Sequence, residues 1–249
     1  MRRTSAGVFS RRAFGVGVTA SVALLSLSER ARAAQIRGRI TGHQHLLNPV
    51  WTEARDPDSR NYTFREPSPT VSADVRRLYP YIPKEVCIAA LTAANSGKMA
   101  PRTVRVAGGR TDAVTLVVPP GTAIKFQNGD PFAHRLYGID VATLGPSDMK
   151  PGAERVWTVP AVGIFEVRDE LVPSLRMWIV GEPKATAVAF PSLDGTFQIE
   201  VPDAGDYTIQ AYFSGKPVGR ALPINVASPA ATVNLAASPL VVATAKGGK

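Results

Sequence analysis

Short apolar segments, separated by glycine and proline, run through most of the chain. Between residues 101 and 182 the apolar positions alternate with polar ones, and Gly-Gly at 108–109, Pro-Pro-Gly at 119–121 and Pro160 interrupt them. A period of two is typical of strands with one buried face, and such frequent turns are typical of an antiparallel sandwich. The pattern therefore predicts strands at 103–107, 113–118, 122–127, 135–139, 154–159, 163–167 and 177–180.

The same pattern of short apolar segments separated by turn residues continues after residue 183. It predicts strands at 185–190, 196–201, 205–213 and 221–226, and a hairpin at Asp194-Gly195. The sequence DGTFQIEVPDAGDYTIQAYFSGK resembles the core of carboxypeptidase regulatory-like domains, which are small, non-catalytic, transthyretin-like β-sandwiches. Residues 183–228 are few for such a domain. We therefore expect that residues 36–54, as strands IRGRI and LLNPVWTEA, complete this second sandwich, and that the tail 229–249 contributes at most an edge strand.

Residues 34–100, which precede both of these parts, combine the N-terminal strands with a proline-rich segment. The prolines disfavour long helices and central strands there. We expect this segment to wrap over a sandwich through its aromatic residues, which could alternatively form a ligand groove. Helices are candidates at 72–78 and 84–95.

Cys87, the single cysteine, lies in an apolar run and is expected to be buried and inert, with a redox role as the alternative. His43 and His45 fit a polar turn, although an extended His-x-His can chelate a metal.

Two segments around 119–180 carry the candidate chemistry. PPGTAIKFQNGDPFAHRLYG places His134 after an N-x-D turn, and VGIFEVRDELVPSLRMWIV places a loop at 168–176 before a return strand. This layout resembles the cupredoxins, the plastocyanin and azurin class, over residues 101–182. The resemblance implies a Greek-key β-sandwich in which one His follows the turn and Cys, His and Met occupy the later loop.

The candidate copper ligands are mostly replaced. In the register of the resemblance, Asp169 stands where Cys is expected, Val172 where His is expected and Leu175 where Met is expected, so only His134 remains. A blue-copper site needs a thiolate and two imidazoles with a weak axial ligand. We therefore expect a degenerate site with no cofactor. The alternative is copper or zinc on a changed ligand set of His134, Asp169 and Met177.

The first 33 residues resemble a twin-arginine signal peptide. Arg11 and Arg12 precede an uncharged apolar stretch, and Ala31-Arg32-Ala33 has the small-x-small pattern of a cleavage site. An ordinary Sec signal is the alternative, and either predicts a periplasmic or secreted bacterial protein. No later stretch is apolar enough for a transmembrane segment in the mature chain.

The net charge of the chain depends largely on its first 33 residues. They hold six Arg and one Glu, so the net charge of +9 falls to +4 without them. A charge of +4 does not indicate nucleic-acid binding.

Catalysis is not indicated, because the chain lacks G-x-S-x-G, H-E-x-x-H and phosphate-loop motifs. Asp169 and Glu170 are adjacent on a strand end and point to opposite sides, which favours a surface salt network with Arg168 and Arg176 over an acid–base pair. The leading hypothesis is an exported, non-catalytic envelope protein that binds an unidentified envelope protein or ligand or has a structural role. The alternative is a metal-binding or electron-transfer protein with an altered ligand set around His134.

The export signal can be tested directly. Replacing Arg11→Lys and Arg12→Lys together should leave precursor in the cytoplasm, because the paired arginines are the recognised element. The measurement is fractionation of cells expressing the full chain. Normal export of the double variant, combined with a block by Sec inhibition, would show that the signal is of the Sec type.

Overall fold

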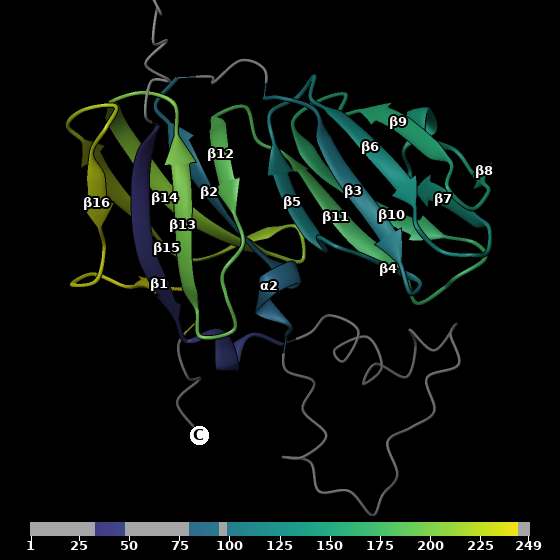
Figure 1. Cartoon of the computed structure of the whole chain (residues 1–249), viewed down its shortest axis with the longest axis horizontal. Coiled ribbons are helices and arrows are strands. Elements are labelled where there is room, and N and C mark those ends of the chain that lie inside the picture. The colour runs from purple at the N-terminus through teal and green to yellow at the C-terminus, as the bar shows by residue number, and fades with distance from the viewer. Residues whose placement is uncertain (1–32, 48–79, 95–98, 244–249) are drawn as a thin grey trace, which may run out of the picture. The chain divides into compact units, whose positions relative to one another are not determined.

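The computed structural model describes residues 33–47, 80–94 and 99–243, and nearly all regular structure in them is strand (Figure 1). The strands form two β-sandwiches, so the predicted all-β fold is confirmed. The predicted signal peptide, apart from Ala33, and most of the proline-rich segment lie outside the described residues. No helix among the described residues is long and apolar enough to cross a membrane.

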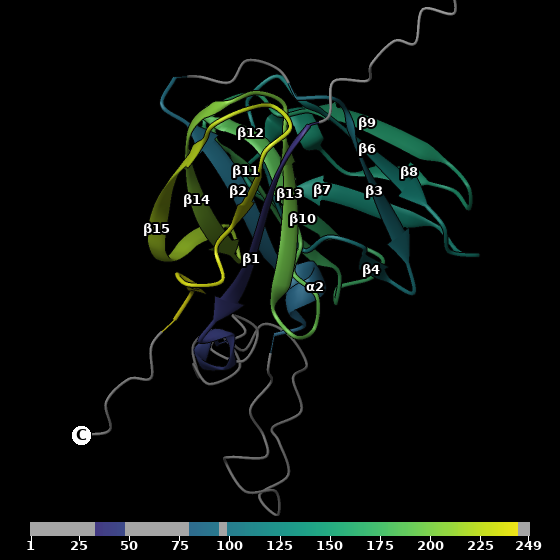
Figure 2. The ribbon, with the colours of Figure 1, turned by 60° about the vertical axis from the view of Figure 1, so that its left-hand side comes forward.

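The first sandwich, here called the terminal sandwich, is built from both ends of the described chain. One sheet has the order β13-β1-β16, with β17 also pairing with β1, and the other has the order β12-β2-β14-β15 (Figures 1 and 2). Its strands are β1 (Ala34–Thr41), β2 (Val86–Thr92), β12 (Ala185–Ala189), β13 (Thr196–Val201), β14 (Gly205–Phe213), β15 (Lys216–Val226), β16 (Thr232–Asn234) and β17 (Leu240–Val241).

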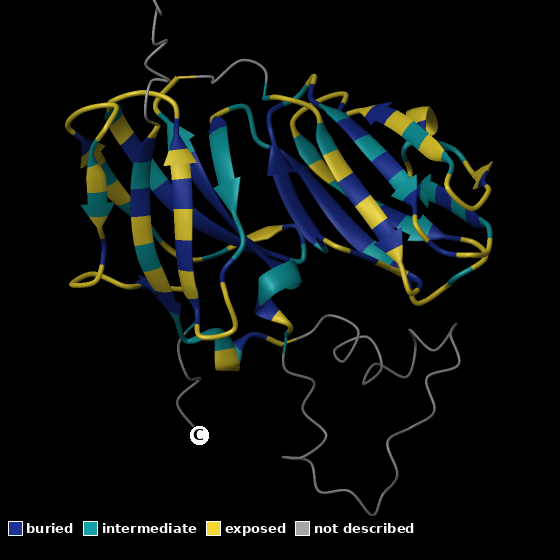
Figure 3. Ribbon diagram, viewed as in Figure 1, coloured by how far each residue is buried: buried dark blue, intermediate teal, exposed yellow. Residues whose placement is uncertain are grey.

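Strand β1 joins the N-terminal region to the C-terminal strands. It pairs antiparallel with β13 from Ala34↔Val201 to Arg39↔Thr196, and parallel with the short strands β16 and β17. Its alternation places Ile36 and Ile40 in a core shared with Phe197 and Ile199, and Figure 3 shows the alternate buried and exposed bands along β1 and β13. Burial of this one face stabilises the pairing of segments that lie far apart in sequence.

The candidate helix at 84–95 is wrong. Only the short helix α2 (Ile82–Glu85) forms there, and Val86–Thr92 is β2, which lies between β12 and β14 in its sheet. Residues 86–90 are all buried, because this strand is covered on both faces. A continuous apolar run of this kind has no period of two, so its pattern does not separate a buried strand from a buried helix.

The strand expected at 46–54 is not seen where the structure describes it. His43–His45 form the 3-10 turn η1, and Leu46 and Leu47 follow it outside any strand, while 48–54 lie outside the described residues. The polar turn expected around His43 and His45 is therefore present. Because the segment is not extended, the same-face argument for a His-x-His chelate does not apply.

The second sandwich, here called the central sandwich, comprises β3 to β11. Its sheets have the orders β4-β3-β6-β9 and β5-β11-β10-β7-β8, and both enclose one apolar core. The strands are β3 (Arg102–Ala107), β4 (Arg110–Thr111), β5 (Thr115–Val118), β6 (Ala123–Asn128), β7 (His134–Gly138), β8 (Ser147–Met149), β9 (Glu154–Thr158), β10 (Gly163–Asp169) and β11 (Arg176–Gly181), with the 3-10 turn η3 (Ala142–Leu144) after β7.

The aromatic residues of the central sandwich occupy three different positions. Phe126 and Trp157 are buried in it, whereas Phe165 is only partly buried against it. Trp178 is also buried, but it does not belong to that core. Since Met177 and Ile179 point inward on β11, Trp178 points to the opposite face of the sheet, where Arg176 stacks on its ring at 4.7 Å.

The tip of the β14–β15 hairpin covers that outer face. Ser214 donates its backbone N–H to Thr115 Oγ1 at 3.0 Å, and Gly215 lies against Ile164 and Trp178. A Cβ atom at Gly215 would stand 2.6 Å from Ile164 Cγ2. Two separate effects therefore favour glycine at position 215. A side chain would collide with Ile164, and the φ of 76° is unfavourable for residues other than glycine.

A pair of glycine variants separates these two effects. Gly152 has the same φ of 76° but nothing within 4 Å of its Cβ position, so Gly152→Ala should lower the free energy of unfolding by about 1–2 kcal/mol. Gly215→Ala should cost about 1–3 kcal/mol more, since the methyl group must displace Ile164 or Trp178. Urea unfolding followed by tryptophan fluorescence measures both; equal losses would show that the hairpin does not press on the sheet.

Candidate functional site

Three loops of the central sandwich meet at His134. The ring lies at the first residue of β7, is fully buried, and has carboxylate oxygens at both nitrogens. Its Nδ1 is 2.6 Å from Asp169 Oδ2, and its Nε2 is 3.0 Å from Asp130 Oδ2. The expected proximity of His134 to the 169–175 loop is thus observed. We call these three residues the Asp130–His134–Asp169 network.

Asp130 is held by the turn between β6 and β7. Asn128, the last residue of β6, accepts the Asp130 backbone N–H on its side-chain oxygen and donates its amide to the carbonyls of Phe132 and Met149. This Asx-type arrangement fixes the direction of the Asp130 carboxylate. The N-x-D turn is visible in the sequence, but its pattern alone does not place Asp130 beside His134.

The hairpin between β3 and β4 supplies two donors to the same carboxylate. Gly108 and Gly109, with φ values of 64° and 66°, direct their backbone N–H groups to Asp130 Oδ1 at 2.6 Å and Oδ2 at 2.8 Å. The left-handed conformation at both positions requires glycine. These amides, with Gly109 as the largest cause, and the contact with His134 hold the pKa of Asp130 below its ordinary value, although burial opposes the shift.

Asp169 closes the opposite side of the ring. It is the last residue of β10, and its Oδ1 accepts backbone N–H groups from Arg135, Leu171 and Val172 at 3.2, 2.7 and 3.0 Å. One carboxylate therefore fixes both the start of β7 and the first residues of the loop before β11. Asp169 is buried, so the surface salt network expected to include it is wrong for this residue.

The neighbouring charges do form a surface network. Glu166 accepts from the Nε atoms of both Arg168 and Arg176, and Arg135 pairs with Asp148 and Glu170. Glu170 and Asp169 thus point to different sides, as their adjacent positions on the strand end predict. Such exposed or partly exposed pairs contribute little to stability individually.

The remaining predicted site residues lie in apolar surroundings. Leu175 and Met177 are buried in the central core, and Val172 is half-buried against it. A Cβ atom at Gly109 would lie 3.0 Å from Val172 Cγ1, so Val172 packs on the glycine hairpin. Among the described residues no group of three or more His, Cys, Asp or Glu side chains could hold a metal ion.

The partners of His134 limit what the ring can do chemically. A carboxylate oxygen lies within hydrogen-bond distance of each ring nitrogen, so neither nitrogen is open to an outside group. In the described part of the chain no hydroxyl or thiol bonds to His134.

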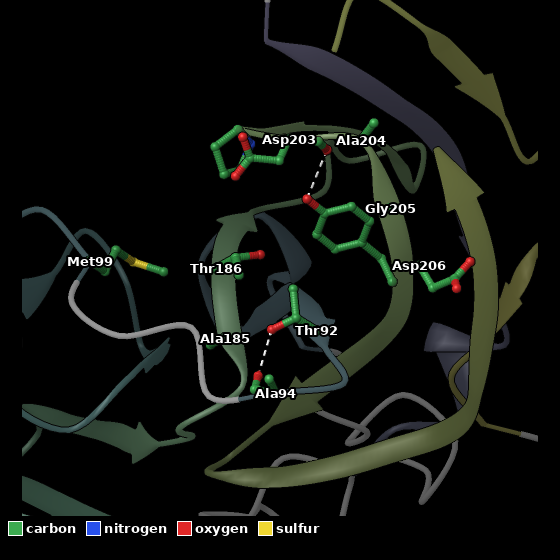
Figure 4. A pocket seen from close by; sticks show the side chains of 11 residues that line it. Thr92, Ala94, Met99, Ala185, Thr186, Asp203, Ala204, Gly205 and Asp206 are labelled. Carbon is green, nitrogen blue, oxygen red and sulfur yellow. Dashed lines mark hydrogen bonds between the residues drawn. The ribbon is translucent and has the colours of Figure 1, made fainter. Parts of the chain in front are cut away.

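A separate pocket of about 380 Å³ lies at one end of the terminal sandwich (Figure 4). Its hydroxyl groups bind within the protein, because Thr92 donates to the Ala94 carbonyl at 2.7 Å and Tyr207 donates to the Asp203 carbonyl at 2.9 Å. Its two carboxylates, Asp203 and Asp206, are exposed. The pocket offers no converging set of polar groups and is not a candidate site.

No family model matches the sequence, and no curated protein sequence matches it significantly. Structural similarity is found to the purple cupredoxin from Nitrosopumilus maritimus, with 17% identity over 32% of this chain and 99% of that chain and a TM-score of 0.30. An oxidised methionine-to-leucine mutant of amicyanin has 19% identity over 40% and 100% of the two chains, with a TM-score of 0.30. The copper-containing nitrite reductase NirK from Thermus scotoductus SA-01 has 22% identity over 38% and 25%, with a TM-score of 0.31. Similarity at this level does not assign the chain to a family.

The buried carboxylates should be far more important for stability than exposed ones. Asp169→Asn should lower the free energy of unfolding by about 3–5 kcal/mol, because it removes one of the two buried carboxylate partners of His134. The matched control is Asp148→Asn, which removes the exposed partner of Arg135 and should cost less than about 1 kcal/mol. Urea unfolding at neutral pH measures both, and similar losses in the two variants would contradict a stabilising network.

The lowered pKa of Asp130 predicts a loss of stability in acid. A carboxylate whose pKa is lower in the folded than in the unfolded state stabilises the fold fully above the unfolded value, near pH 4, and loses this effect as the pH falls through the folded value. The free energy of unfolding should therefore fall below about pH 4, and Asp130→Asn should make that fall shallower. Unfolding curves at successive pH values measure the slopes; parallel slopes in both proteins would rule out the contribution.

Proposed function

We propose that this chain is an exported, non-catalytic protein of the bacterial envelope whose cupredoxin-like sandwich has exchanged its copper site for the Asp130–His134–Asp169 network. The observation that supports this most strongly is that both ring nitrogens of the buried His134 already have carboxylate partners. A histidine that ligates a metal must offer a lone pair from one nitrogen. Here each ring nitrogen already lies within hydrogen-bond distance of a carboxylate oxygen.

The donor set also argues against a blue-copper centre. The cupredoxin resemblance places Asp169, Val172 and Leu175 at the other three ligand positions, and neither Val nor Leu can bind a metal. The single thiol, Cys87, lies on β2 of the terminal sandwich and is fully buried, and burial raises its pKa to about 12. A thiolate ligand is thus missing from the central sandwich and disfavoured at the one cysteine.

The altered set of His134, Asp169 and Met177 remains the rival proposal. A metal bound at either ring nitrogen would have to replace a hydrogen bond to Asp130 or Asp169. Met177 is buried among apolar residues of the central core. Carboxylate and imidazole ligands would suit zinc or Cu(II), so direct metal addition distinguishes this proposal from the first.

A binding or structural role fits the network better than catalysis does. An Asp–His pair activates a nucleophile only when a hydroxyl or thiol lies within hydrogen-bond reach of the imidazole. Both nitrogens of His134 are engaged by carboxylates, which leaves neither for a substrate or nucleophile. We propose that the network instead secures the loops at this end of the central sandwich. The signal-like segment at 1–33 supports the proposed periplasmic or secreted location.

Metal titration tests this proposal. Adding Cu(II) to metal-free protein should give no intense blue absorbance, because that band requires a Cu–thiolate bond. Adding Cu(II) or Zn(II) should also leave the melting temperature unchanged. A stoichiometric blue band would overturn the proposal. Tight colourless binding that disappears in His134→Ala would favour the rival ligand set.

A variant with the copper ligands of cupredoxins at positions 169, 172 and 175 tests whether these positions correspond to the ligand positions of that class. The triple variant Asp169→Cys, Val172→His and Leu175→Met provides a thiolate, a second imidazole and a thioether beside His134. It should gain a blue Cu(II) band if these positions correspond to the ligand positions of the cupredoxins. A folded triple variant that stays colourless would show that the register is wrong, while the result for the natural chain would stand on its own.

A further inference from the structure

A groove of about 1040 Å³, lined by both polar and apolar side chains, crosses the outer face of the β13-β1-β16 sheet in the terminal sandwich. The alternation of β1 places Arg37 and Arg39 on this face, opposite Gln198 and Thr196 of β13. Asn234 of β16 lies on the other side of Arg37 in the strand register. Among the described residues that line the groove, none is acidic.

The two guanidinium groups are oriented by neutral partners. Arg37 donates from Nε to Gln198 Oε1 at 3.1 Å and from Nη2 to Gln35 Oε1 at 2.9 Å, while Arg39 donates from Nε to the Asp194 backbone carbonyl at 2.9 Å. No salt bridge joins either arginine to a carboxylate in the described part of the chain. These hydrogen bonds orient both groups without neutralising them, but the Asp194 carboxylate lies near Arg39: the pKa of Asp194 is lowered first by hydrogen bonds from Thr196 and also by the charge of Arg39.

The spacing and the surroundings of the arginines define what the groove could hold. Residues two apart on a strand are separated by roughly 7 Å and face the same side, so the groove presents two cations in a row. The side-chain amides of Gln198 and Asn234 and the hydroxyls of Thr196 and Ser192 flank them. Thr196 donates its hydroxyl to Asp194 Oδ1 at 2.8 Å, so this oxygen can only accept from a ligand. The remaining lining includes apolar surface from Phe190 and Phe197.

We propose that this groove binds an acidic polysaccharide, with sugar carboxylates on Arg37 and Arg39 and sugar hydroxyls on the neighbouring amides and hydroxyls. Arginine forms two-pronged hydrogen bonds with carboxylates, and amide and hydroxyl side chains both donate and accept, as sugar hydroxyls do. An extended peptide would instead pair with a free strand edge, because the face of a sheet has no unpaired backbone groups. The position on the face therefore favours a glycan over a peptide.

Calorimetry with the mature full chain tests the proposal, using tetragalacturonate as the acidic probe and its fully methyl-esterified form as a neutral probe of the same shape. The acidic probe should bind and the ester should not. Two exposed ion pairs together account for about a tenfold change in affinity, so Arg37→Gln with Arg39→Gln should weaken binding about tenfold. Both positions are exposed, and an unchanged melting temperature would verify that the variant is folded.

A charge-matched control separates a site from general attraction. Lys216→Gln with Arg220→Gln removes the same charge from exposed positions on β15, which belongs to the other sheet of the terminal sandwich, and should leave the affinity unchanged within about twofold. Absence of tetragalacturonate binding, or equal weakening by both double variants, would overturn the proposal. Tighter binding of a tetraglutamate peptide would overturn it in favour of a peptide ligand. None of these results depends on whether the central sandwich binds metal.

Discussion

The central sandwich depends on one buried imidazole held between two carboxylates. Asp130 connects His134 to the Gly108–Gly109 hairpin, and Asp169 connects it to the loop before β11. Each carboxylate also accepts backbone N–H groups that would otherwise need partners in a buried place. Loss of one acid would leave one nitrogen of His134 and several buried backbone donors without that partner, so the three loops are stabilised together.

This dependence explains how the residues at 169, 172 and 175 fit one another. A carboxylate at 169 needs several donors when it is buried, and the backbone N–H groups of Leu171 and Val172 supply them only if the loop turns tightly around it. Apolar side chains at 172 and 175 then pack against the glycine hairpin and the core. The positions that the resemblance assigns to metal ligands thus act as one hydrogen-bonded and packed unit.

Glycine and proline separate most strands of the central sandwich, and β3, β6 and β7 alternate buried and more exposed positions, so the sequence predicted most of them. It failed at β2, where a continuous apolar run has no period of two. The contact between His134 and Asp169 was anticipated from the family register. The role of Asp130 was missed, because a carboxylate in a turn is usually a local cap, and only the folded hairpin brings Gly108 and Gly109 to it.

The charged side chains of the two sandwiches differ in their surroundings, and this difference affects where a ligand would bind. In the central sandwich the buried side chains of Asp130, His134 and Asp169 contact one another, which leaves little to attract an outside partner. On the β13-β1-β16 face, Arg37 and Arg39 have neutral hydrogen-bond partners that orient them, and neither forms a salt bridge within the described residues, although the Asp194 carboxylate lies near Arg39. An anion that binds there gains attraction without breaking an existing ion pair. Recognition is therefore expected on the terminal sandwich, while the central sandwich retains its histidine for stability.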